Sequence, residues 1–223
     1  MTVFLLDNSL LFPPAELADE DGLLAVGGDL SPQRLILAYS KGIFPWYDPT
    51  EPILWWSPDP RLVLFPQELH ISKRLKRIIK QEKFRVTFNK DFENVIKSCA
   101  QVRVVKGEET WIGEEMIAAY TKLHKLGFCI SAEAWFEGEL VGGLYGVLIG
   151  KVFFGESMFS KVSNASKVAF IKCVSMLYSK GLKLVDCQVE TDHLKSFGAR
   201  LIPRQLFISL LERWTHPLKV VSF

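Results

Sequence analysis

The segment 129–157, CISAEAWFEGELVGGLYGVLIGKVFFGES, decides the fold of this chain. It holds three apolar runs, at 129–136, 139–148 and 152–157. The runs are joined by Glu137-Gly138 and Gly150-Lys151, and short connections containing glycine are typical of turns between antiparallel strands. The segment therefore predicts an antiparallel meander of three strands.

The sequence on both sides of the meander predicts helices and further strands. We expect strands at 62–65, 84–88 and 183–188. We expect helices at 72–80, 91–102, 114–126, 164–180 and 204–214. This order predicts an α+β fold, with one mixed, mainly antiparallel sheet flanked by helices.

Residues 1–62 differ from the rest because turn-forming proline and glycine recur throughout them. They leave room for one short helix, with Ser31 as its N-cap, Pro32 at its first position and Gly42 just past its end. We therefore predict two domains, a small loop-rich one at 1–62 and a larger one at 63–223.

Charge is distributed unevenly along the chain. The 27 basic and 25 acidic residues give a net charge of +2, but residues 1–64 carry −6 and the remainder +8. Eight basic residues and one acid fall within 70–90, where Lys73, Arg77 and Lys80 would share one helical face. Such a run indicates either a solvated helix face or a phosphate-binding surface.

Several classes of protein are disfavoured by what the sequence lacks. The longest run without a charge, 140–150, is shorter than the roughly 20 residues of a membrane-spanning helix, and the N-terminus does not resemble a signal peptide. The four cysteines form no C-x-x-C pair, which predicts buried free thiols in a reducing cytosol. The four histidines show no metal-ligand spacing, so no zinc site is expected.

Nucleotide-binding and hydrolase motifs are also missing. No P-loop, G-x-G-x-x-G or G-x-S-x-G occurs. A meander followed by a helix is the order found in N-acetyltransferases, but the connection at 157–167 contains no glycine to grip a pyrophosphate.

The sequence Asp186-Cys187-Gln188 is the first candidate for chemistry. On a strand, Asp186 and Gln188 would face the same side and Cys187 the other. One interpretation is a strand end that emerges into solvent. The other is a carboxylate that orients a carboxamide, whose oxygen accepts a hydrogen bond from a substrate amine; the glutamine would position the amine and not act as a base.

Glu156 is the second candidate, and two tryptophans are the third. Glu156 follows the apolar run 152–154, where it would be either a rim residue or a counter-charge for a cationic substrate group. Trp46 and Trp111 lie near turn residues and would either fill the core or stack on a nucleobase.

A set of motifs resembles a known family, the bacterial leucyl/phenylalanyl-tRNA–protein transferases. They are GLLAVGGDLSPQRLILAYSKGIFPWY, ILWWSPDPRLVL, TWI, LVGGLYGV, GESMFSKVSNASK and DCQ, in this order, and the resemblance runs from about residue 12 to 211. It implies a cytoplasmic, monomeric enzyme without metal or cofactor, whose larger domain is N-acetyltransferase-like. The enzyme would move Leu or Phe, and less well Met, from aminoacyl-tRNA to the N-terminal amine of proteins beginning with Arg or Lys, which tags them for degradation by the N-degron pathway.

The resemblance also implies roles for particular residues. Asp186 and Gln188 would handle the acceptor amine, and Trp46 and Trp111 the terminal adenosine. Substrate binding is implied for Glu156, Ser157 and Met158 of the GESMFS motif. The pocket for the transferred side chain is implied to contain Leu144, Phe153, Phe170, Cys173 and Leu177. The surface that binds tRNA is implied to contain Lys73, Arg77 and Lys80.

Three positions depart from the family pattern. Ile130 stands where a histidine is common before Ser131, which removes any mechanism based on that histidine. Cys173 and Leu177 stand where relatives can have phenylalanine, which bears on side-chain preference. The sequence is compatible with two other functions: an enzyme that attaches amino acids from aminoacyl-tRNA to cell-wall peptide precursors, and a non-catalytic RNA-binding module.

Overall fold

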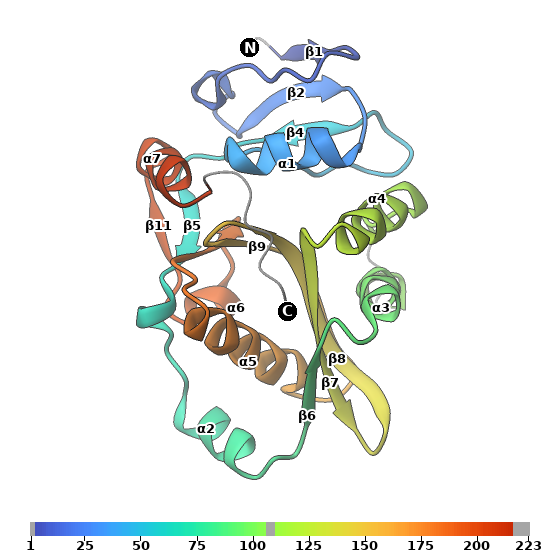
Figure 1. The fold of residues 1–223 in the computed structure, drawn as a ribbon, viewed down its shortest axis with the longest axis vertical. Coiled ribbons are helices and arrows are strands. Elements are labelled where there is room, and N and C mark those ends of the chain that lie inside the picture. The colour runs from blue at the N-terminus through green and yellow to red at the C-terminus, as the bar shows by residue number, and fades with distance from the viewer. Residues whose placement is uncertain (1–2, 106–109, 216–223) are drawn as a thin grey trace.

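The computed structural model describes residues 3–105 and 110–215, which form two sheets and the helices around them (Figure 1). A four-stranded sheet has the order β1-β2-β4-β3, and a seven-stranded sheet has the order β11-β5-β10-β9-β8-β7-β6. The mixture of helices and strands confirms the predicted α+β class.

The meander forms the centre of the larger sheet. Strands β7 (Cys129–Phe136), β8 (Glu139–Ile149) and β9 (Val152–Ser160) pair antiparallel in sequence order, as predicted. Strand β10 (Leu184–Gln188) pairs parallel with β9, so the sheet is mixed. The remaining strands of this sheet, all antiparallel to their neighbours, are β5 (Arg61–Leu64), β6 (Arg85–Phe88) and β11 (Arg200–Ile202).

Helices cover both faces of the larger sheet. Helix α5 (Ala165–Ser179) packs on one face, and α3 (Phe92–Val105) and α4 (Glu114–Lys125) pack on the other (Figure 1). Gly142 of β8 permits the close approach of α5, since a Cβ atom there would lie 2.5 Å from the Cβ of Ala165. The other helices are α1 (Pro32–Ser40), α2 (Lys73–Lys80), α6 (Asp192–Lys195) and α7 (Arg204–Trp214), with 3₁₀ turns η1 (Ala15–Leu17) and η2 (Pro66–Glu68).

The N-terminal segment contains more regular structure than its sequence indicated. Helix α1 is capped as predicted, because the Ser31 side chain accepts a hydrogen bond from the Arg34 backbone N–H. The four strands of the small sheet were not predicted, since at two to five residues they are too short to show periodicity. They are β1 (Phe4–Leu6), β2 (Leu23–Gly27), β3 (Phe44–Pro45) and β4 (Leu54–Trp56). The domain boundary after residue 62 stays a prediction.

The four cysteines are all buried, as the sequence predicted, and none of them forms a disulfide bond. Within residues 3–105 and 110–215, no helix has the length and apolar character needed to cross a membrane. The same residues contain no group of three or more His, Cys, Asp or Glu side chains arranged to hold a metal ion.

Candidate active site

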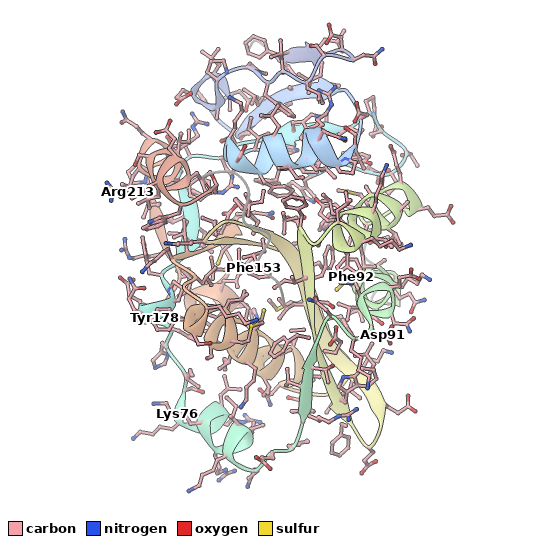
Figure 2. All side chains as sticks on the ribbon, in the orientation of Figure 1. Lys76, Asp91, Phe92, Phe153, Tyr178 and Arg213 are labelled. Atoms are coloured by element: carbon pink, nitrogen blue, oxygen red, sulfur yellow. The ribbon has the colours of Figure 1, made fainter. Side chains whose placement is uncertain are left out.

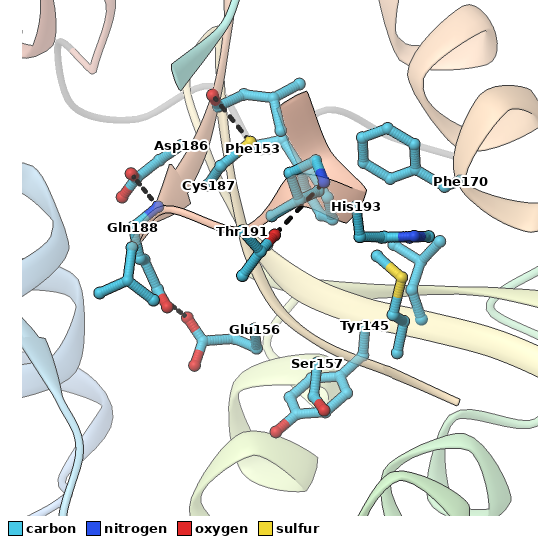
Figure 3. Close-up of a pocket in the computed structure, with 16 residues that line it drawn as sticks. Tyr145, Phe153, Glu156, Ser157, Phe170, Asp186, Cys187, Gln188, Thr191 and His193 are labelled. Atoms are coloured by element: carbon cyan, nitrogen blue, oxygen red, sulfur yellow. Dashed lines mark hydrogen bonds between the residues drawn. The ribbon is translucent and has the colours of Figure 1, made fainter. Parts of the chain in front are cut away.

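The candidate site lies where β9 and β10, the two parallel strands, approach their C-terminal ends. Asp186 is in register with Phe154, so Glu156 lies two residues further along the neighbouring strand. A cavity of about 270 Å³ opens beside these residues (Figure 3). Its lining includes eight of the predicted site residues: Leu144, Phe153, Glu156, Ser157, Met158, Phe170, Asp186 and Gln188.

A second cavity, of about 130 Å³, adjoins the first. Trp46 and Trp111 both line it, together with Phe44 and Pro45. Glu156, Gln188 and Val189 border both cavities. The structure thus places the two predicted tryptophans beside Glu156 and Gln188, the polar side chains that also border the first cavity.

Asp186 is fully buried, so the strand does not emerge into solvent at this residue. Both of its oxygens are bound by the Arg61 guanidinium, with Nε donating to Oδ1 at 2.8 Å and Nη2 to Oδ2 at 2.7 Å. Arg61 is itself 1% exposed. A buried carboxylate is tolerated when it is paired and hydrogen-bonded in this way.

Gln188 does not continue the regular alternation of the strand. The pairing of β10 with β5 shifts between Asp186 and Gln188, and Gln188 has a positive φ of 62°. Its backbone N–H donates to Asp186 Oδ1 at 2.9 Å, and its side-chain Nε2 donates to Glu156 Oε1 at 2.9 Å (Figure 3). Asp186 therefore orients Gln188 through the main chain, and Glu156 holds the carboxamide.

Glu156 receives hydrogen bonds from three neutral groups. Besides Gln188, the Tyr39 hydroxyl donates to Oε1 at 2.8 Å and the Tyr120 hydroxyl donates to Oε2 at 3.1 Å. The two tyrosine hydroxyls also contact each other, but because each has a single proton they cannot bond to each other while both donate to Glu156. Tyr39 comes from α1 and Tyr120 from α4, so two helices from separate parts of the chain hold this carboxyl.

Burial raises the pKa of Glu156 to about 7, and the nearby charge of Asp186 acts in the same direction. The hydrogen bonds from Tyr39, Tyr120 and Gln188 oppose this increase. Burial also raises the pKa of Tyr39 and of Tyr120 well above the ordinary value, so both hydroxyls remain protonated donors. Among the described residues, no lysine or arginine forms an ion pair with Glu156.

The remaining predicted residues lie away from this junction. Cys173 and Leu177 are buried in the core behind the first cavity and are not among its lining residues, so their role in the pocket stays a prediction. Lys73, Arg77 and Lys80 are exposed on α2, near the end of the molecule opposite the small sheet, where Figure 2 shows the neighbouring Lys76 pointing outward.

No pattern in the sequence indicated Arg61, Tyr39 or Tyr120 as site residues. Each contacts its partner across 36 to 125 residues of sequence, so no local pattern links them. Arg61 alone gave a signal, as a charged residue at the start of the apolar run 61–64.

Known proteins resemble this chain over most of its length. A family model described as leucyl/phenylalanyl-tRNA protein transferase matches residues 63–212, and the model of its N-terminal domain matches residues 28–59. A transferase of that name from Syntrophobacter fumaroxidans is 57% identical over 211 residues, which cover 95% of this chain and 90% of the relative. One from Pseudomonas syringae pv. syringae is 56% identical, covering 96% of this chain and 93% of the relative.

Solved structures resemble the chain more distantly. The aminoglycoside acetyltransferase meta-AAC0020 from an uncultured soil metagenomic sample has a TM-score of 0.39 at 14% identity, covering 64% of this chain and 95% of its own. L-PGS from Bacillus licheniformis has a TM-score of 0.42 at 12% identity, covering 76% of this chain and 54% of its own.

The fold, the site and the sequence relatives together define the chain as an aminoacyltransferase that uses aminoacyl-tRNA as donor and protein as acceptor. It belongs to the leucyl/phenylalanyl-tRNA–protein transferase family, which its sequence motifs had indicated.

Proposed function

We propose that this enzyme transfers Leu or Phe, and less well Met, from aminoacyl-tRNA to the N-terminal α-amine of proteins that begin with Arg or Lys. The product would carry a new N-terminal residue that marks it for degradation by the N-degron pathway. The reaction would take place in the cytoplasm, with the enzyme as a monomer. Four buried cysteines without a disulfide bond fit a reducing compartment.

The observation that carries this proposal is the junction of the two cavities. Glu156 and Gln188 border both, so a donor that fills both cavities would present its central atoms to these two side chains. An aminoacyl-adenosine has this layout, because its ester carbonyl lies between the amino-acid side chain and the ribose. The junction is therefore where we expect the acceptor amine to meet the ester.

The lining of each cavity supports one part of the donor. Leu144, Phe153 and Phe170 give the first cavity an apolar wall that suits an unbranched, γ-branched or aromatic side chain. Trp46, which is 46% exposed, and Trp111 give the second cavity aromatic surfaces on which the terminal adenine could stack.

The chemistry requires no covalent enzyme intermediate, because the aminoacyl ester is already activated. The amine nitrogen attacks the ester carbonyl carbon, the bond from that carbon to the ribose oxygen breaks, and one proton passes from the nitrogen to the leaving oxygen. Because Gln188 donates through Nε2 to Glu156, its Oε1 faces away and is free in orientation to accept a hydrogen bond from the amine. Holding the two reactants together in this way supplies much of the rate enhancement. The neighbouring ribose hydroxyl can carry the proton.

Glu156 would also determine acceptor preference. Its Oε2 receives only the Tyr120 hydrogen bond among those described, which leaves capacity for a cationic group. We propose that this carboxylate pairs with the Arg or Lys side chain at the N-terminus of the acceptor protein.

The exposed basic residues of α2 would bind the tRNA backbone. Lys73, Arg77 and Lys80 are all exposed on one short helix, whose buried Leu75 anchors it to the rest of the protein. Contacts of this kind add affinity without reading the nucleotide sequence.

The experiment that tests the proposal compares two acceptors. The enzyme is incubated with labelled Phe-tRNA and a peptide that starts with Arg, and in parallel with the same peptide starting with Ala. We expect transfer to the first peptide only. Equal transfer to both peptides would contradict the acceptor preference, and transfer to neither would contradict the proposed function as a whole.

A further inference from the structure

Arg61 is the most completely buried cation beside the site, and it is bound on several sides. It lies at the start of β5, which is the strand between β11 and β10. Its guanidinium carbon lies 4.6 Å from the centre of the Phe44 ring and 4.7 Å from that of Phe207. Aromatic rings at this distance stabilise a desolvated cation and restrict its movement.

The two rings come from opposite ends of the sequence. Phe44 belongs to β3 and also lines the second cavity, whereas Phe207 belongs to α7. The guanidinium is therefore contacted by β3, α7 and β10, which are distant in the sequence. These contacts leave little freedom for the Asp186 carboxylate bound to it.

The Asp186 carboxylate accepts hydrogen bonds from three donors. Its Oδ1 accepts from both Arg61 Nε and the backbone N–H of Gln188, and its Oδ2 accepts from Arg61 Nη2. The Gln188 N–H comes from a residue with positive φ, a conformation that a non-glycine residue keeps only when its surroundings hold it. A displaced Asp186 carboxylate would release this turn and, with it, the carboxamide that faces Glu156.

We propose that Arg61 is a positioning residue for aminoacyl transfer, which holds Asp186 so that Asp186 fixes the backbone turn that aims the Gln188 carboxamide. The inference rests on the proposed function. It assigns Asp186 a role through its hydrogen bond to the main chain and makes Arg61 as important to turnover as Asp186, although Arg61 lines neither cavity.

The test measures kcat and KM for Arg61→Met with Phe-tRNA as donor. We expect kcat to fall by about 10²-fold, the loss typical of a 1 Å misplacement of a reacting group, while KM for the tRNA changes little. The assay uses the acceptor peptide on which the unchanged enzyme is most active. If the proposed acceptor preference is wrong, the unchanged enzyme itself shows no such preference. If this inference is wrong, the kcat of Arg61→Met equals that of the unchanged enzyme.

A double variant separates positioning from the loss of a charge pair. Arg61→Met leaves Asp186 as an unpaired buried charge, and Asp186→Asn in the same chain removes that charge while keeping an oxygen that can accept the Gln188 N–H. We expect the double variant to remain about 10²-fold below the unchanged enzyme in kcat, because it also lacks the guanidinium that holds residue 186 in place. Should Arg61→Met not fold, the double variant alone is compared with the unchanged enzyme, with the same expectation.

Arg34 offers a matched control. It is also a fully buried arginine, bound to Asp29 Oδ2 at 3.2 Å and to the Asp7 carbonyl at 2.8 Å, but it lines neither cavity. Arg34→Met should lower the melting temperature and leave kcat unchanged. The inference is overturned if folded Arg61→Met has the kcat of the unchanged enzyme, or if the folded double variant recovers that kcat without Arg61.

Discussion

The two carboxyl groups of the site, Asp186 on β10 and Glu156 on β9, lie on neighbouring parallel strands in opposite environments. Asp186 is bound at both oxygens by the Arg61 guanidinium. Among the residues that the structure describes, Glu156 is bound only by neutral donors, two tyrosine hydroxyls and one carboxamide, and its pKa is raised to about 7. The same chemical group is therefore part of a buried ion pair in one position and a carboxyl with a raised pKa in the other.

The two carboxyl groups therefore have different roles at the site. A carboxylate that is fully engaged by arginine can hold a backbone turn but has little capacity to bind a substrate. A carboxyl with no cation beside it can attract one from the substrate. Gln188 connects the two, since Asp186 accepts its backbone N–H and Glu156 accepts its side-chain N–H.

Removal of the fixed carboxylate should have the largest effect. We expect Asp186→Ala to lower kcat by about 10²-fold or more, because the Gln188 turn loses its acceptor. The variant should also lose roughly 3–5 kcal/mol of stability, because Arg61 is left as an unpaired buried charge. Binding of aminoacyl-tRNA should hardly change. Steady-state kinetics and thermal unfolding measure these effects, and near-normal turnover by a folded Asp186→Ala protein would exclude this carboxylate from the mechanism.

Substitution of the titratable carboxyl should change the pH dependence of stability. Since the pKa of Glu156 is raised in the folded state from 4.5 to about 7, its contribution to the free energy of unfolding is complete below pH 4.5 and is lost as the pH rises through about 7. We expect the free energy of unfolding of Glu156→Gln, relative to that of the unchanged protein, to increase by about 2 to 3 kcal/mol between pH 4.5 and pH 8. Urea unfolding at both pH values checks this, and a constant difference would show that Glu156 does not titrate in this range.

The same substitution should weaken use of cationic acceptors. We expect Glu156→Gln to raise KM for an Arg-starting peptide by roughly tenfold, the size of one hydrogen bond to a charged group, with a smaller effect on KM for the tRNA. In the unchanged enzyme this KM should fall as the pH rises through about 7, because Glu156 becomes charged; in the variant this part of the dependence should be absent. A defect confined to tRNA use would assign Glu156 to the donor instead.

The sequence predicted the three-stranded meander and the helices of eight or more residues because these elements are long enough to show periodicity, but it missed β11 and α6, which have three and four residues. The bounds of β7 (Cys129–Phe136) and α7 (Arg204–Trp214) are those expected from the residues alone. The sequence also identified Asp186, Gln188 and Glu156 as candidates, since each is a polar residue within or after an apolar run.

The contacts among these residues could not be predicted. Alternation along a strand placed Asp186 and Gln188 on one face, but the positive φ of Gln188 turns the chain and makes the contact through the backbone. The donors to Glu156 come from α1 and α4, and Arg61 comes from β5, so each depends on the tertiary arrangement of distant elements. The two carboxylates look alike in the sequence because only these partners distinguish them.

Substitutions of the basic residues of α2 should have the smallest effect on the site itself. Replacing Lys73, Arg77 and Lys80 together with Ala should reduce the slope of log affinity for tRNA against log salt by about 2 to 3, because each phosphate contact contributes roughly 0.7–0.9. Affinity should fall similarly for Leu-tRNA and Phe-tRNA. Transfer from an aminoacyl-adenosine, which has no acceptor stem, should be unchanged and controls for folding. An unchanged salt slope in a variant that is active on the minimal donor would make these residues an ordinary solvated face.

The most direct test of the account is a crystal structure of the enzyme with a non-hydrolysable phenylalanyl-adenosine, in which an amide replaces the ester. We expect the phenyl ring in the cavity lined by Phe153 and Phe170, the adenine against Trp46 or Trp111, and the amide carbonyl beside Gln188 and Glu156. An analogue that binds with its carbonyl away from Gln188 and Glu156, or that leaves either cavity empty, would contradict the claim that the two cavities meet at the reaction centre.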